Sequence, residues 1–235
     1  MEALSLPLYP VTPAQLREHE EAFSDPWIAK KLNRKRRTRE HFEYLKKHVP
    51  QFLEKKTSTK FHYILDVGCG AGESLEIARY FGHIAVGIDA PPDSQEGMGA
   101  KYTAACRLMH RRQKLTVVYK NAIDELPKFP REWDCINFRG SFSQCLEHLL
   151  IGPRHSETHD SRQLCWAVGE STERQLLDFM LVLKGLLNPG GCILIALNEP
   201  GNIQQFQEMF QKVSNQVGLV DEYPGEKLMF KLRIS

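Results

Sequence analysis

Short apolar runs alternate with amphipathic stretches from about residue 61 to the end of the chain. The apolar runs predict strands at 63–67, 84–88, 115–119, 135–138 and 192–197. The amphipathic stretches predict helices at about 72–81, 96–112, 172–187 and 202–215. Strands that alternate with helices indicate βαβ units and a mainly parallel sheet.

The end of this region has a different pattern. Residues 228–234 alternate between apolar and mostly polar side chains, which is typical of a half-buried antiparallel strand. In the helix before the fifth strand, Thr172 and Gln175 are placed to form a capping box, and the turn at 188–191 is expected to end that helix. We therefore expect an antiparallel C-terminal strand beside the parallel ones.

Before residue 60 the pattern is helical. Thr12, followed by a proline and a glutamine, predicts a helix that runs to about Phe23, where the pair at 25–26 interrupts it. A second helix is expected from near Thr38 to Pro50, and residues 55–60 are polar enough to be a linker. These features predict an N-terminal helical appendage over residues 1–60.

Composition places the chain among ordinary globular proteins, because 42% of its 235 residues are hydrophobic and 26% are charged. The six cysteines show no CxxC pair and no spacing to histidine that suits zinc, so we expect reduced thiols and no metal site. The N-terminus lacks a signal-peptide pattern, and no apolar run approaches the roughly 20 residues that span a bilayer. A cytoplasmic protein without a transmembrane segment is expected.

Charge is distributed unevenly behind a net value of +2. Residues 30–60 hold twelve Lys and Arg against three Glu, whereas the segments on either side are acidic overall. Seven of these cations lie within residues 30–39, and a second basic cluster at 107–114 includes His110. Nucleic acid, a phosphorylated substrate or an anionic membrane surface would suit such cations, and so would a solvated helix face.

The segment with the clearest chemistry is Asp66-Val67-Gly68-Cys69-Gly70-Ala71-Gly72, which joins the first strand to a helix. Glycines there let a ligand lie against main-chain N–H groups at the positive end of the helix. A dinucleotide fingerprint would need a third glycine where Glu73 stands, and no Gly-Lys-Ser/Thr follows as in a phosphate loop. Asp89 ends the next strand, and a carboxylate at that edge can accept both hydroxyls of a ribose.

With these features the sequence resembles the class I S-adenosylmethionine-dependent methyltransferases over about residues 61–235. The resemblance also includes Asn121 to Pro127, the strand after Trp133-Asp134, and the turn at 187–191. It implies an α/β, Rossmann-like, doubly wound and mainly parallel sheet of about seven strands with an antiparallel C-terminal strand, preceded by N-terminal helices. It also implies S-adenosyl-L-methionine as cofactor and S-adenosyl-L-homocysteine as product.

The resemblance assigns roles to individual residues. Gly68 and Gly70 would pack against the methionine part of the cofactor, Asp66 would orient the loop, and Asp89 would hold the ribose. The expected cofactor-binding residues are Asp66, Gly68, Cys69, Gly70, Gly72, Asp89, Ala90, Asn121, Ala122 and Ile123. Adenine would lie between Ala90 and the Ala122–Ile123 stretch. Many relatives carry Gly-Asp-Ala before the Leu-Pro pair, and here Ala122 stands where that Asp would be, so Asn121 would contact the adenine amine if the loop is shifted by one residue.

Candidate catalytic residues follow the fourth strand, where relatives place residues that face the substrate. A base is needed only if the acceptor must lose a proton, and histidine is the commonest one. This stretch offers His148 and His155, within a lid-like insert at about 142–171. Arg139 is the third candidate; it would bind a carboxylate of cofactor or substrate, or form a structural ion pair.

The class of methyl acceptor is constrained mainly by a motif that the sequence lacks. The fourth strand ends in Asn137-Phe138-Arg139-Gly140, and it is not followed by the Asn/Asp-Pro-Pro-Tyr/Phe motif of related enzymes that methylate exocyclic amines. A small-molecule acceptor is therefore the leading hypothesis. Two alternatives stay open: an RNA methyltransferase guided by the basic residues at 30–39, and a non-catalytic protein that binds the cofactor in a regulatory role. Oligomeric state is left undetermined.

Overall fold

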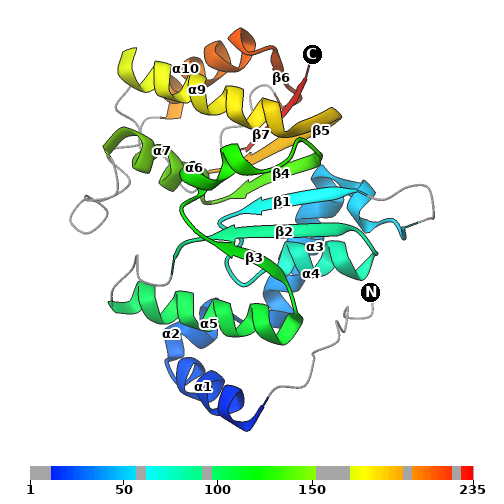
Figure 1. Ribbon diagram of the computed structural model, residues 1–235, viewed down its shortest axis with the longest axis vertical. Helices are drawn as coiled ribbons and strands as arrows, with labels where there is room; N and C mark the ends of the chain where they lie inside the picture. The colour runs from blue at the N-terminus through cyan, green and yellow to red at the C-terminus, as the bar shows by residue number, and fades with distance from the viewer. Residues whose placement is uncertain are drawn as a thin grey trace. The chain divides into compact units, whose positions relative to one another are not determined.

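The structure is a computed structural model that describes residues 12–56, 62–91, 97–151, 170–197, 203–223 and 229–234 (Figure 1). The chain divides into two compact units, Met1–Asn121 and Ala122–Ser235. Among the residues described, no helix is both long enough and apolar enough to cross a membrane.

The first unit combines three N-terminal helices with the start of the sheet. Its elements are α1 (Pro13–Phe23), α2 (Pro26–Lys31), α3 (Arg34–His48), the 3-10 turn η1 (Pro50–Leu53), β1 (Tyr63–Val67), α4 (Glu73–Tyr80), β2 (Ile84–Asp89), α5 (Gly97–Gln113) and β3 (Thr116–Tyr119). The strands are parallel in the order β3-β2-β1, with Val67 opposite Ile88 and Asp89 opposite Tyr119. Their carboxyl ends therefore lie in line along one edge.

The N-terminal helices differ from the sequence prediction. The Asp25-Pro26 pair starts a helix rather than only ending one, because the Asp25 carboxylate accepts the N–H of Trp27 at 2.9 Å and Pro26 occupies the first turn. The next helix begins at Arg34 and not near Thr38, since the Asn33 side chain caps it by accepting the Arg36 N–H. The chain thus has an additional short helix, α2.

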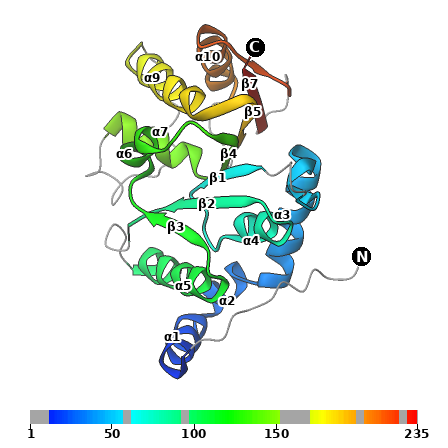
Figure 2. The ribbon, with the colours of Figure 1, turned by 45° about the vertical axis from the view of Figure 1, so that its right-hand side comes forward.

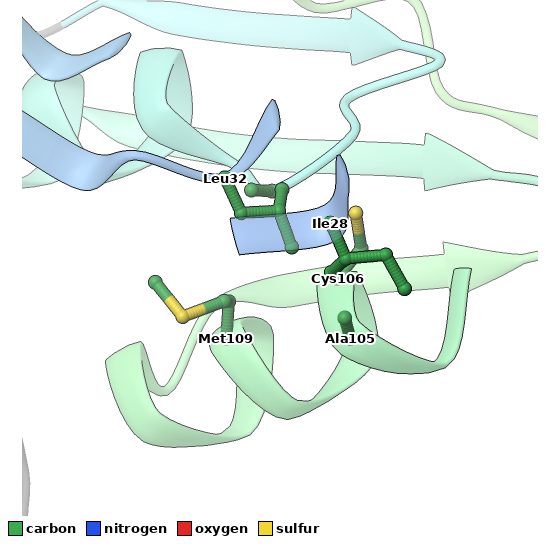
Figure 3. Packing of buried hydrophobic residues seen from close by; sticks show 6 residues of the cluster. Ile28, Leu32, Ala105, Cys106 and Met109 are labelled. Atoms are coloured by element: carbon green, nitrogen blue, oxygen red, sulfur yellow. The ribbon is translucent and has the colours of Figure 1, made fainter. Parts of the chain in front are cut away.

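Helix α2 is anchored by apolar packing against α5 (Figure 3). Ile28 and Leu32 are 0% and 2% exposed, and they contact Ala105, Cys106 and Met109. Burying one such aliphatic side chain contributes about 1.5–3 kcal/mol. Helix α3 lies beside α4 in both views of the ribbon (Figures 1 and 2). The sequence-predicted domain boundary at residue 60 therefore separates segments that pack together, and the boundary stays a prediction.

The second unit carries the rest of the sheet. Its elements are α6 (Ala122–Glu125), the 3-10 turn η3 (Leu126–Lys128), β4 (Trp133–Arg139), α7 (Phe142–Ile151), α9 (Glu170–Leu186), β5 (Leu187–Ala196), α10 (Ile203–Gln216), β6 (Leu219–Asp221) and β7 (Met229–Ile234). Strands β4 and β5 are parallel, and β7 pairs antiparallel with both β5 and β6. A chain of aromatic contacts, from Phe138 through Phe142 and Phe210 to Phe230, fills its core.

The predicted fold class is confirmed. The seven strands of the described part of the chain have the order β3-β2-β1-β4-β5-β7-β6, with an antiparallel C-terminal strand and flanking helices, as in Rossmann-like methyltransferases. Strand β6 escaped prediction because it has only three residues.

Two local predictions in the second unit are corrected. Strand β5 begins at Leu187 rather than Cys192, and the turn at 188–191 forms an irregularity in its pairing with β4, where Asn188 donates to the Glu132 carbonyl at 2.8 Å. Helix α9 begins at Glu170, so Thr172 lies buried inside its first turn rather than at the cap.

The lid-like insert at about 142–171 is described only at its two ends. Its first part is helical, because α7 covers Phe142–Ile151 and packs Phe142 into the aromatic core. Residues 152–169, with His155, lie outside the described residues. The lid stays a prediction.

Candidate functional site

The glycine loop between β1 and α4 turns at the carboxyl edge of the first unit's strands. Gly68 and Cys69 donate their N–H groups to the Ile88 carbonyl at 2.8 and 3.2 Å, which fastens the start of the loop to β2. Gly68, Gly70 and Gly72 have φ angles of 70°, 55° and 82°. Side-chain-bearing residues rarely adopt this left-handed region, so the alternation of glycines follows from the backbone path.

The surroundings of Gly72 also exclude a side chain, whereas those of Gly70 leave room for one. A Cβ at Gly72 would overlap the Leu115 methyl group and approach the His110 ring to 3.2 Å. A Cβ at Gly70 would lie 3.5 Å from the Tyr102 hydroxyl and 3.6 Å from Nη2 of Arg37. The loop is thus enclosed by α5 on one side and by a side chain of α3 on another.

Asp89 ends β2 and directs a carboxylate toward this edge of the sheet. Its Oδ1 accepts the N–H of Ala90 at 3.0 Å, and the residue keeps part of its surface exposed. Burial raises the pKa of Asp89 from 3.8 to about 6, an effect that the bond from Ala90 only partly offsets. At neutral pH the carboxylate is charged and has acceptor capacity left for ligand hydroxyls.

His110 of α5 is a site residue that the sequence analysis placed among surface cations. It is 2% exposed, its Nε2 lies 2.6 Å from the Gly70 carbonyl, and its Nδ1 lies 2.8 Å from the Tyr119 hydroxyl. A carbonyl only accepts, so Nε2 carries the hydrogen and Nδ1 accepts from Tyr119. Burial lowers the pKa of His110 to about 4, although the hydrogen bond to Gly70 acts to raise it. The ring is therefore neutral at physiological pH.

The periodicity of α5 is the signal that could have identified His110. Thr103, Cys106, His110 and Gln113 recur at helical spacing and are all buried. The arginines of the run at 107–112 lie more toward the surface, since Arg111 is exposed and Arg107 is half-buried over the Tyr119 ring. The cluster that looked uniformly basic therefore has a neutral, inward-facing member.

Cys69, Asp89 and His110 bring three potential metal-ligand atoms within 4.8 Å of one another. The arrangement does not suit a metal ion, because His110 Nε2 already donates to Gly70 and burial raises the pKa of the Cys69 thiol well above its ordinary value. Of the three side chains, the Asp89 carboxylate is the one with acceptor capacity left for a ligand.

Arg37 joins the N-terminal helices to this loop. Its Nε lies 2.5 Å from Oε1 of Glu73, the first residue of α4, and Glu73 is only 3% exposed. Nη1 donates to the Tyr102 hydroxyl at 3.3 Å. His41 lies one turn further along α3. Its Nδ1 is 2.8 Å from the Ser74 hydroxyl, and its Nε2 is 3.8 Å from the Glu73 carboxylate. In the sequence, Arg37 is distinguished only as one cation in a run.

The other expected cofactor residues occupy the following places. Asp66 is buried in β1, Ala90 follows β2, Asn121 follows β3, and Ala122 and Ile123 open α6 of the second unit. The structure brings Asp66, the glycine loop, Asp89, Ala90 and Asn121 together in one unit. Their roles stay predictions.

The catalytic candidates are less well located. Arg139 ends β4 and is half-buried, while His148 lies in α7 with a side chain that the structure does not describe. His155 lies outside the described residues. Their catalytic roles stay predictions.

The arrangement in the first unit suits a nucleoside that carries a polar tail. Asp89 offers a charged acceptor for hydroxyls, and the loop at 68–72 offers close backbone approach next to the N-terminus of α4. The fit to S-adenosylmethionine is therefore good in the type and placement of the groups.

Comparison with known proteins gives a family match. A family described as "Methyltransferase domain" matches residues 34–217. A search of curated proteins found no match. Among solved structures, a SAM-dependent methyltransferase from Archaeoglobus fulgidus is similar with 18% identity and a TM-score of 0.46, over 76% of this chain and 67% of that one.

Two further structures are similar over more of the chain. The SAH-bound methyltransferase PaMTH1 of Podospora anserina shares 14% identity at a TM-score of 0.48, over 96% of this chain and 89% of that one. DesVI of Streptomyces venezuelae shares 13% identity at a TM-score of 0.48, over 97% and 100%.

Proposed function

The chain belongs to the methyltransferase-domain family, and from this premise we propose that it transfers a methyl group from S-adenosyl-L-methionine to a small-molecule acceptor. S-adenosyl-L-methionine is the cofactor, and S-adenosyl-L-homocysteine is the product. The observation that carries the proposal is the charged acceptor Asp89 beside a loop of three left-handed glycines.

Within this proposal the site residues of the first unit have distinct roles. Asp89 accepts the ribose hydroxyls, and Gly68 and Gly70 let the amino-acid part of the cofactor approach the backbone. The neutral ring of His110 donates its Nε2–H to the Gly70 carbonyl and so fixes the shape of the loop. Ala90 and Asn121 remain the proposed adenine contacts of this unit.

The bound cofactor supplies a methyl group on a sulfonium, which is an activated leaving group. The protein then needs mainly to align the acceptor with that methyl group for in-line displacement, and positioning of this kind supplies about 7–11 kcal/mol. His148, His155 and Arg139 stay the candidates for proton removal or substrate binding. Ala122 and Ile123 stay candidates for the adenine contact.

Transfer of a labelled methyl group tests the proposal. The protein is incubated with methyl-labelled cofactor in three separate reactions. One contains the low-molecular-weight fraction of a cell extract, one contains total RNA, and one contains no added acceptor. Label in a small organic product supports the proposal, and the loss of that label in Asp89→Asn links it to the site. Binding of the cofactor without transfer to any acceptor favours the non-catalytic, regulatory alternative.

RNA methylation is a second candidate, favoured by the exposure of the basic residues at 30–39. Among the described side chains of that segment, five cations are exposed: Lys30, Lys31, Lys35, Arg36 and Arg39. RNA binding through them would weaken steeply with salt. The variant with Lys35→Gln and Arg39→Gln should then lose RNA affinity and keep cofactor affinity. Label in RNA that disappears in this variant would replace the small-molecule proposal.

A further inference from the structure

Arg37 belongs to the basic segment at 30–39, and its side chain turns toward the glycine loop. The exposed fraction of its side chain is 18%, whereas that of its neighbour Arg36 is 53%. Arg36 pairs with Glu40 on the surface of α3 at 3.5 Å, an interaction that contributes little in solvent. The two adjacent arginines therefore have different environments, and one serves as a matched control for the other.

The guanidinium of Arg37 is held by groups of the first unit on several sides. Glu73 contacts Nε and Nη2, and Nη1 donates to the Lys31 carbonyl at 3.1 Å and to the Tyr102 hydroxyl at 3.3 Å. Burial disfavours the charge, but the interactions with Glu73 and Tyr102 together outweigh this effect and keep the pKa of Arg37 above its ordinary value. The cation is therefore permanent and fixed in orientation.

One donor of this guanidinium remains available to a ligand. Nη2 has two N–H groups, and among the described residues it has a single partner, Glu73, at 3.3 Å. The same Nη2 is the nitrogen that faces Gly70, at 3.6 Å from the position of an added Cβ. A ligand atom placed beside Gly70, where a side chain would otherwise lie, is therefore within reach of Nη2 of this half-buried cation.

We propose that Arg37 binds the carboxylate of the cofactor's amino-acid end as that end lies along the glycine loop. This inference rests on the function proposed above, because it takes the adenosyl part to be held at Asp89. An arginine–carboxylate bond is charge-assisted and is strengthened by the low exposure of the site. Arg37 selects ligands that carry this carboxylate over truncated nucleosides that lack it.

Two ligands separate the carboxylate from the rest of the cofactor. S-adenosyl-L-homocysteine carries the amino-acid end, and 5′-methylthioadenosine has the same nucleoside and sulfur without it. Calorimetry measures the affinity of each ligand for the full chain and for Arg37→Met. We expect Arg37→Met to weaken S-adenosyl-L-homocysteine by about 10- to 100-fold, as for a hydrogen bond to a charged group, and to leave 5′-methylthioadenosine unchanged.

Two matched variants test whether the effect is specific to this arginine. Arg36→Met removes an exposed cation from the adjacent position and should change neither affinity. Arg139→Met removes the arginine that the sequence put forward for the same carboxylate. A loss of S-adenosyl-L-homocysteine affinity in Arg139→Met, with none in Arg37→Met, overturns the proposal.

A third variant controls for folding, since Arg37→Met leaves Glu73 buried without its cation. The double variant with Arg37→Met and Glu73→Gln removes both charges and should show the same selective loss. If both ligands weaken equally in the double variant, the role of Arg37 is structural and the proposal is wrong. If the unaltered protein binds neither ligand, the proposed cofactor site is wrong. If the unaltered protein binds both ligands and Arg37→Met binds them equally well, only the proposed role of Arg37 is wrong.

Discussion

Replacing Asp89 by asparagine should make the ligand-free protein more stable and its cofactor site weaker. The shift of the pKa of Asp89 from 3.8 to about 6 corresponds to a cost of up to about 3 kcal/mol for holding the carboxylate charged in the folded state. Because part of the residue is exposed, solvent reduces this to about 1–2 kcal/mol. Asparagine keeps an oxygen for the Ala90 N–H and removes the charge.

The stability difference should depend on pH in a defined direction. Between pH 3.8 and about 6 the folded state holds more protons at Asp89 than the unfolded state does, so this group lowers stability as the pH rises through that window. Asp89→Asn should therefore gain its full advantage above pH 6 and lose it below pH 3.8. The effect on binding is opposite, because ribose hydroxyls need the ionised acceptor.

Two assays measure these quantities. Urea unfolding of the ligand-free protein gives the stability difference on both sides of pH 6, and calorimetry gives the affinity for S-adenosyl-L-homocysteine. We expect Asp89→Asn to lose about 10- to 100-fold in affinity, and the unaltered protein to lose about tenfold per unit as the pH falls below 6. Asp124→Asn, at an exposed carboxylate, is the control. A less stable Asp89→Asn at neutral pH, or equal affinity, would refute the reasoning.

Three further results are expected. Gly72→Ala should lower the free energy of unfolding by about 2–4 kcal/mol in urea titration, from its left-handed φ of 82° and the overlap with Leu115; an unchanged midpoint would contradict the loop geometry. Ile28→Ala should lower it by about 2–4 kcal/mol, because Ile28 is fully buried against α5, whereas exposed Trp27→Ala should have a much smaller effect. The described cysteines are buried, so a thiol reagent should modify a Cys165→Ser variant only after unfolding; fast labelling of the native variant would show that they are accessible.

The strands and the ribose acid could be predicted because their signals are local. Each buried strand is a short aliphatic run, and Asp89 and the glycines stand at the ends of such runs. The start of α2 was missed for a different reason. An Asp-Pro pair can end one helix or start the next, and both readings fit Asp25-Pro26. The tertiary packing of Ile28, which is fully buried, shows that the pair starts a helix here.

The contacts around the loop could not be predicted, because they depend on residues far apart in the sequence. Arg37 meets Glu73 across 36 positions, and His110 meets Gly70 across 40. Both residues sit in runs of cations, where charge alone suggests a solvated surface. Only the packing of α3 and α5 in the first unit shows which members of those runs face inward.

A crystal structure of the protein with S-adenosyl-L-homocysteine tests the central claim most directly. The account predicts that the ribose hydroxyls lie within hydrogen-bond distance of the Asp89 carboxylate and that the amino-acid end runs along residues 68–72 with its carboxylate at Arg37. A ligand bound elsewhere, or a site that stays empty at saturating ligand, would contradict it.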